Sequence, residues 1–143
     1  MTAPVTVQHQ SKVARLIYSA MVTGVLLMAV VGQLVLRPKM PVRDPKEFPP
    51  AFRLVILAAI LAASVASFLW FRKQVPKRGA DQSADAFWVK AAGPAIVGWA
   101  IAEGSCLMGV VIYAVLGFTD AIAIAAFGFI VLLLMNPARL ETR

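Results

Sequence analysis

The chain has 143 residues, of which 60% are hydrophobic and only 15% are charged. In soluble domains about half of the residues are apolar and about a quarter are charged. The additional apolar residues of this chain lie in four blocks separated by short polar stretches, which is typical of membrane proteins. The net charge of +7 does not indicate a nucleic-acid partner, because the basic residues lie at the ends of the apolar blocks, where they anchor helices against lipid headgroups.

The four apolar blocks predict an all-α fold, an integral membrane bundle of four transmembrane helices that forms a single domain over residues 1–143. We expect these helices at about 13–36, 52–71, 88–116 and 119–135.

The first block begins with a basic lead, Lys12 and Arg15, but its apolar run is far longer than the core of a signal peptide. We therefore expect a retained helix, which ends at the helix-stopping pair Arg37-Pro38.

The first connection, 37–51, is rich in proline and carries charges of alternating sign. Proline disfavours helix and favours extended backbone, partly of the polyproline-II type. We interpret this segment as a stiff, solvated outer loop. The alternative is a strap that docks a neighbouring subunit outside the membrane, because a stiff strap loses less entropy on binding. The second connection, 72–87, is polar and is expected to be an ordinary cytoplasmic loop.

The last two blocks are expected to form a tight antiparallel hairpin, because only Gly117 and its immediate neighbours separate them.

Pro94 falls within the first turns of the third block, where a missing backbone donor costs least. Trp99 lies deeper in the same block and is expected to pack between helices. Asn136-Pro137 ends the fourth block.

Orientation follows from the Lys and Arg residues on each side of the membrane. One face collects nine of them and the other five, so both termini are expected in the cytoplasm, in a bacterial inner membrane. The nine are Lys12, Arg15, Arg72, Lys73, Lys77, Arg78, Lys90, Arg139 and Arg143, and the five are Arg37, Lys39, Arg43, Lys46 and Arg53.

Small residues recur at four-residue spacing in these blocks, and such rows let helix backbones approach closely within lipid. These rows predict a tight bundle or an oligomer, in which the protein packs with further copies of itself or with other membrane subunits. The residues singled out for helix packing are Gly24, Gly32, Ala59, Ala63, Ser67, Gly98, Ala102 and Gly109.

Catalytic and metal-binding sets are missing from the sequence. The only histidine is His9, near the N-terminus, and the only cysteine is Cys106, which lies inside an apolar block and is expected to pack as a small residue. No Ser-His-acid set, Cys-His set or His/Cys metal cluster can be assembled from these residues. We therefore predict no enzyme, no cofactor and no metal.

Glu103 is the one acidic residue near the middle of an apolar block. A charged side chain near the bilayer centre costs roughly 2.5 kcal/mol or more on insertion scales, and removal from water favours the neutral carboxyl group. Thr23 and Ser64 are expected near its level, and Ser105 lies two residues along. These three hydroxyls are the predicted partners of Glu103, either as a hydrogen-bonded contact between helices or as part of an ion-binding site.

The pair Ala102-Glu103, followed by Gly109 and an apolar Val/Ile run, resembles the ion-binding helix of the proteolipid c-subunits of rotary ATPases. The resemblance covers about residues 100–116, and it implies that Glu103 is the proton or sodium site of an oligomeric ring. Four helices with one intramembrane glutamate are also similar to the small multidrug exporters, whose glutamate lies on the first helix.

The leading hypothesis is therefore a non-enzymatic polytopic membrane protein, a structural or accessory subunit that packs with itself or with a larger complex. The alternative is a proton- or cation-translocating bundle, proteolipid-like or small-transporter-like, that uses Glu103.

Overall fold

A computed structural model describes residues 9–39 and 47–141, and this part of the chain is helical and contains no strand. The predicted all-α fold is confirmed, and four helices are long and apolar enough to span a membrane. The elements are α1 (Gln10–Val31), the π-helical turn η1 (Gly32–Leu36), α2 (Arg37–Lys39), α3 (Pro50–Gln74), α4 (Ala84–Leu116), α5 (Thr119–Leu134) and α6 (Pro137–Glu141).

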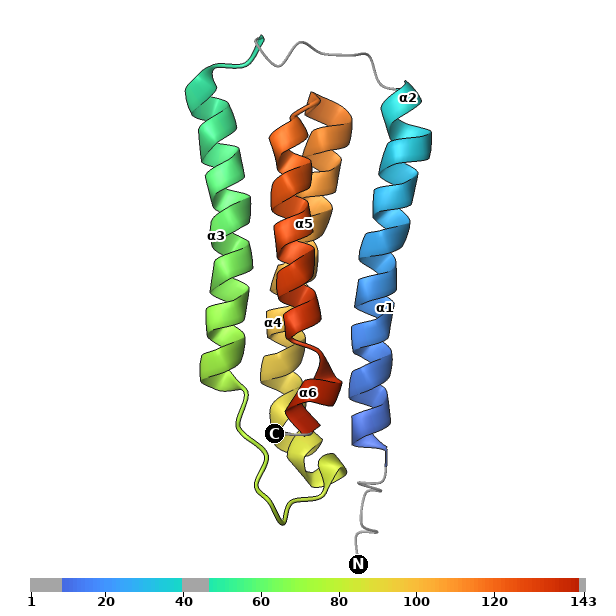
Figure 1. Ribbon diagram of the computed structural model, residues 1–143, viewed down its shortest axis with the longest axis vertical. Helices are drawn as coiled ribbons and strands as arrows, with labels where there is room; N and C mark the ends of the chain where they lie inside the picture. Colours follow the sequence, from blue (N-terminus) through green and yellow to red (C-terminus); the bar gives the residue numbers. More distant parts are fainter. Residues whose placement is uncertain (1–8, 40–46, 142–143) are drawn as a thin grey trace, which may run out of the picture.

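The hairpin of α4 and α5 lies in the middle of the bundle, with α1 on one side and α3 on the other (Figure 1). α4 contacts all three other long helices, and α3 also packs against α5. The described part of the chain starts and ends at the same end of the bundle (Figure 1). At about 1.5 Å per residue α4 is roughly 50 Å long, so it extends beyond a hydrocarbon core of about 30 Å.

The first helix is longer than predicted, because Arg37-Pro38 does not stop it. The backbone N–H of Arg37 donates to the carbonyl of Gly32, five residues back, in the wider π turn η1. Proline lacks a backbone donor and crowds the carbonyl four residues before it. A widened turn directly before Pro38 accommodates this, and α2 continues to Lys39.

Other helix ends also differ from the predicted ones by a few residues. α3 starts at Pro50, since proline is well tolerated in the first turn. α4 starts at Ala84, because the Ser83 side chain accepts a hydrogen bond from the Ala86 N–H, 3.2 Å away, and caps the helix. Pro94 consequently lies inside α4 and not in its first turns. Residues 40–46 of the predicted outer loop, 37–51, lie outside the part of the chain that the structure describes.

The predicted hairpin between α4 and α5 is present. Gly117 ends α4 in the left-handed region, with φ of 74°, and its N–H donates to the Tyr113 carbonyl at 3.0 Å. Glycine adopts this conformation without the steric cost that a side chain brings. α5 then starts at Thr119.

Two side chains from other helices bind the carbonyls at the end of α5. Tyr18 of α1 donates its hydroxyl to the Leu132 carbonyl at 3.1 Å, and Trp99 of α4 donates its indole N–H to the Met135 carbonyl at 2.9 Å. The last carbonyls of a helix lack the usual backbone donor four residues further on, and the Leu132 carbonyl also accepts from the Met135 N–H at 3.1 Å. Trp99 is fully buried, so its predicted place between helices is confirmed, as is the burial of Cys106.

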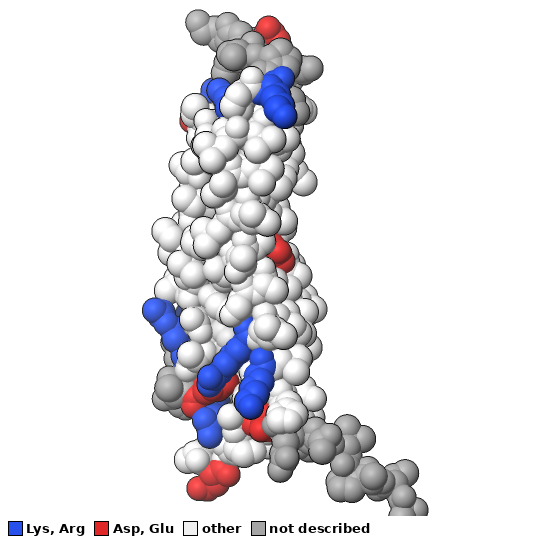
Figure 2. All heavy atoms as spheres, turned by 90° about the vertical axis from the view of Figure 1, so that its right-hand side faces the viewer, with Lys and Arg blue, Asp and Glu red and all other residues white. Residues whose placement is uncertain are grey.

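Charged side chains gather at the two ends of the bundle, with a wide uncharged band between them (Figure 2). Ion pairs join Arg53 to Asp120 at one end and Arg15 to Glu141 at the other. Glu141 also accepts a hydrogen bond from the Trp88 indole at 2.8 Å. These contacts attach α3 to α5 at one end, and at the other end they join α1 and α4 through Glu141 of α6.

Candidate functional site

Glu103 lies near the middle of α4, on the side of that helix that faces α1, and its side chain is half-buried. Across from it is Gly24 of α1. A Cβ added at Gly24 would lie 3.3 Å from Glu103 Oε1, so the missing side chain makes the room that the carboxyl group occupies. α1 and α4 therefore meet around an acidic group in the apolar part of the bundle.

A groove of about 470 Å³ opens to the outside of the bundle at this point. Its walls come from one face of α1 and one face of α4, and all the lining residues except Glu103 are apolar. They are Gly24, Leu27, Met28, Val31, Glu103, Leu107 and Val111. In Figure 2 the uncharged band is interrupted by acidic atoms at about mid-height.

The carboxyl group of Glu103 makes no hydrogen bond and no ion pair with any residue in the ranges 9–39 and 47–141. Polar side chains within a membrane usually face a partner, a cavity or the bundle interior, because an unsatisfied one is costly. Glu103 faces a cavity, the groove between α1 and α4, but no side chain of the described residues forms a hydrogen bond or an ion pair with it.

The serine hydroxyls expected beside Glu103 bond elsewhere. Ser64 Oγ of α3 and Ser105 Oγ of α4 are 2.9 Å apart, and Ser105 Oγ is also 2.8 Å from the Ala102 carbonyl oxygen. Ser67 Oγ donates to the Ser64 carbonyl at 2.7 Å. Two residues along a helix correspond to a rotation of about 200°, so Ser105 points away from α1 and toward α3. The predicted contact of Ser64 and Ser105 with Glu103 is not formed.

Thr23, the third expected partner, is exposed on the outside of α1. The neighbouring residue Gly24, one position further along α1, faces α4 instead. Thr23 therefore lies close to the level of Glu103 along the bundle, but it makes no hydrogen bond with it.

The glycines singled out for packing lie at close contacts of α4 with the other helices. Added Cβ atoms would lie 2.8 Å from Val110 Cγ1 at Gly32, 3.1 Å from Phe71 Cδ2 at Gly98 and 2.8 Å from the Ala125 Cβ at Gly109. Ala102 is fully buried.

The small row on α3 is placed differently. Ala59 is exposed and Ala63 is half-buried, while Ile60, Ser64, Ser67 and Phe71 make up the buried face. Of this row, Ser67 is buried as expected, Ala63 is buried only in part, and Ala59 does not pack within the chain.

The apolar residues that complete the groove were not singled out in the sequence. Their helical spacing is the sequence feature that identifies them. Leu27, Met28 and Val31 follow Gly24 by three, four and seven residues and therefore lie on the same face of the helix. Leu107 follows Glu103 in the same way.

Among the residues that the structure describes, no group of three or more His, Cys, Asp or Glu side chains lies close enough together to hold a metal ion. No protein-family model, no curated protein and no solved structure matches this chain. The functional interpretation therefore rests on the geometry of the groove at Glu103.

Proposed function

We propose that the protein is a non-enzymatic accessory subunit whose groove between α1 and α4 receives a transmembrane helix, from a second copy or from a larger membrane complex. The carboxyl group of Glu103 is the observation that carries this proposal. It faces an open apolar groove and accepts no hydrogen bond from the described residues. A partner helix that brings a hydrogen-bond donor to this level satisfies the group and fills the groove.

The position of α1 supports docking at this side of the bundle. Only 11% of the most apolar stretch of the first span is buried, against 50% for α4. Association of helices in lipid depends on close packing and on polar contacts. The groove offers both, since Gly24 permits close approach and Glu103 provides the acceptor.

A second copy of the chain has a suitable donor on its own surface. Thr23 is exposed close to the level of Glu103. Two copies that pack along α1 bring the hydroxyl of one copy to the carboxyl group of the other. Interhelical hydrogen bonds of this kind contribute roughly 0.6 to 2 kcal/mol in lipid, so the packing of α1 has to supply the rest of the association energy.

Two substitutions of Glu103 test this proposal, with blue-native electrophoresis of a mild-detergent extract as the measurement. Glu103→Gln keeps a side chain that forms hydrogen bonds, so we expect the assembly to persist. Glu103→Leu removes these bonds and Gly24→Leu fills the groove, so each is expected to shift the protein toward the monomer.

Gly104→Leu is the matched control, because it adds the same bulk one residue from Glu103 at a position with open space around its added Cβ. It is expected to leave the assembly intact. A wild-type protein that migrates as a stable monomer without a partner would contradict the proposal, and so would an assembly that survives Glu103→Leu and Gly24→Leu.

The second candidate is a proton- or cation-translocating bundle, proteolipid-like or small-transporter-like. The same carboxyl group favours it, because an accessible acid without a competing donor can take up and release a proton or hold a cation. The apolar lining of the groove favours it less, since no other described group there can relay a charge.

Carbodiimide labelling tests the second candidate. A hydrophobic carbodiimide reacts with a protonated carboxyl group. We expect it to modify Glu103 between about pH 6 and pH 8, and we expect sodium or raised pH to slow the reaction. Glu103→Gln is the control that removes the target. An unreactive Glu103, or a reaction independent of both pH and sodium, counts against ion binding.

A further inference from the structure

We infer that the end of the bundle where α3 stops holds an anionic phospholipid of the adjoining leaflet, with its phosphate beside Arg72 and Lys77 and an acyl chain against Phe68 and Leu134. Two adjoining hollows between the end of α3 and α6 make up this site. It is separate from the groove at Glu103, and it does not depend on the function proposed above.

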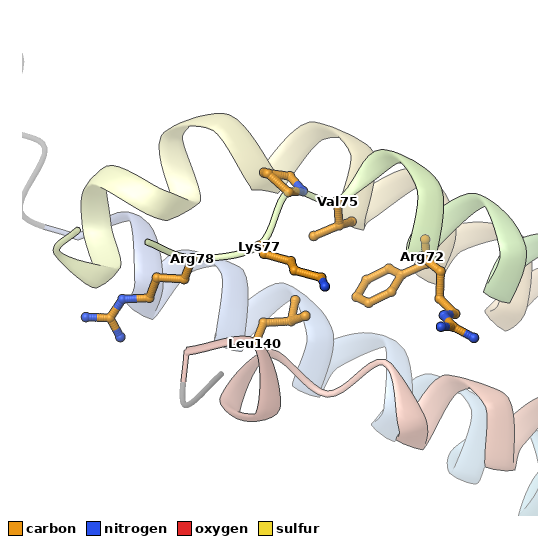
Figure 3. A pocket seen from close by; sticks show the side chains of 7 residues that line it. Arg72, Val75, Lys77, Arg78 and Leu140 are labelled. Carbon is orange, nitrogen blue, oxygen red and sulfur yellow. The ribbon is translucent and has the colours of Figure 1, made fainter. Parts of the chain in front are cut away.

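The outer hollow has a volume of about 190 Å³ and is lined by the last residues of α3, the segment after it and α6. Arg72, Lys77 and Arg78 contribute to its walls, while Phe71, Val75 and Leu140 provide apolar surface. Figure 3 shows the Lys77 side chain extended into the space between α3 and α6, whereas Arg78 points away from it.

The inner hollow, of about 300 Å³, shares Phe71, Arg72 and Leu140 with the outer one, and Arg139 also lines it. It continues along the bundle between α3 and α5, where Phe68 and Leu134 line it. Both residues belong to spanning helices. The two hollows together combine basic side chains with apolar residues of spanning helices. This combination matches the headgroup and the acyl chain of a phospholipid, and a free anion would leave the apolar part unused.

The charges near this site do not cancel. No acidic side chain lines either hollow among the described residues. Glu141, the nearest acid along α6, is bound by Arg15 and by the Trp88 indole. Arg78 is held by the carbonyls of Gln82 and Glu141, at 2.8 and 2.6 Å. Arg72 and Lys77 therefore present positive charge to the lipid interface, where anionic headgroups attract basic residues.

Native mass spectrometry of the full-length protein in a neutral detergent tests this inference. Phosphatidylglycerol and phosphatidylcholine are added at equal concentrations, and the lipid-bound fractions are compared. One basic residue near a membrane surface changes anionic lipid binding about fivefold. We expect phosphatidylglycerol to be preferred, and the pair of substitutions Arg72→Gln and Lys77→Gln to reduce this preference at least about tenfold.

Lys73→Gln with Lys90→Gln is the matched control, because both lysines are exposed at the same end of the bundle and line neither hollow. This pair is expected to keep the preference. An equal loss in both double variants, or no preference in the wild type, would overturn the inference. Displacement of the lipid by inorganic phosphate would also overturn it, because the site would then be one for a free anion.

Discussion

Gly128 is a residue at which three helices meet at close distance. It lies on α5 and faces the serine cluster of α3 and α4. A Cβ added there would lie 2.9 Å from Ser64 Oγ, 3.1 Å from Cys106 Sγ and 3.2 Å from Ser105 Oγ. Each of these atoms belongs to a fully or nearly fully buried side chain, so none of them can move away without repacking its own helix.

We therefore expect Gly128→Ala to destabilise the bundle by about 1 to 3 kcal/mol, as overpacking of a well-filled interior does. Thermal unfolding in detergent measures this. Gly104→Ala is the control, since its added Cβ meets no atom within 4 Å; alanine favours helix over glycine by about 1 kcal/mol, so this variant should be unchanged or slightly more stable. Equal melting temperatures for the two variants would contradict the packing argument.

At the scale of helices, the sequence was sufficient to predict four spans, because each carries its own uninterrupted apolar run. The helix ends were less predictable, since they depend on local chemistry. Ser83 caps α4 by accepting from the Ala86 N–H, and serine before an apolar helix is a sequence signal for a helix start. The π turn before Pro38 has no comparable sequence signal.

The rotation of each helix about its axis could not be predicted from the sequence. In a soluble helix, the contrast between apolar and polar faces tells the inside from the outside. Here lipid and protein interior are both apolar, so α3 exposes Ala59 and buries Ser64 and Ser67. The same ambiguity explains why Ser105 and Ser64 were expected beside Glu103. Their level along the bundle could be inferred, whereas the face on which they lie could not.

At the scale of the whole molecule, the distribution of positive charge bears on the orientation in the membrane. Among the residues that the structure describes, the end that holds Arg15, Arg72 and Lys77 has more basic residues than the opposite end. Basic residues are retained in the cytoplasm. The described start and end of the chain lie together at this richer end (Figure 1). We therefore predict that this end faces the cytoplasm.

Labelling of introduced cysteines with a membrane-impermeant maleimide tests the orientation. Asp81→Cys is exposed between α3 and α4, and Thr119→Cys is exposed at the other end of the bundle. Only Thr119→Cys should react in right-side-out vesicles, and only Asp81→Cys in inverted ones. The wild type serves as the control, because Cys106 is buried. The reverse pattern would show that the orientation is the opposite one.

The distance along the chain between α1 and its main partner, α4, has a consequence for biogenesis. At about 5 to 20 residues per second, synthesis completes α4 roughly 4 to 17 seconds after α1 has been made. During this interval the first helix resides in the bilayer before most of its packing surface exists. Its own apolarity, and not its contacts, must keep it inserted, and its sparse burial in the finished bundle fits a segment that is stable in lipid alone.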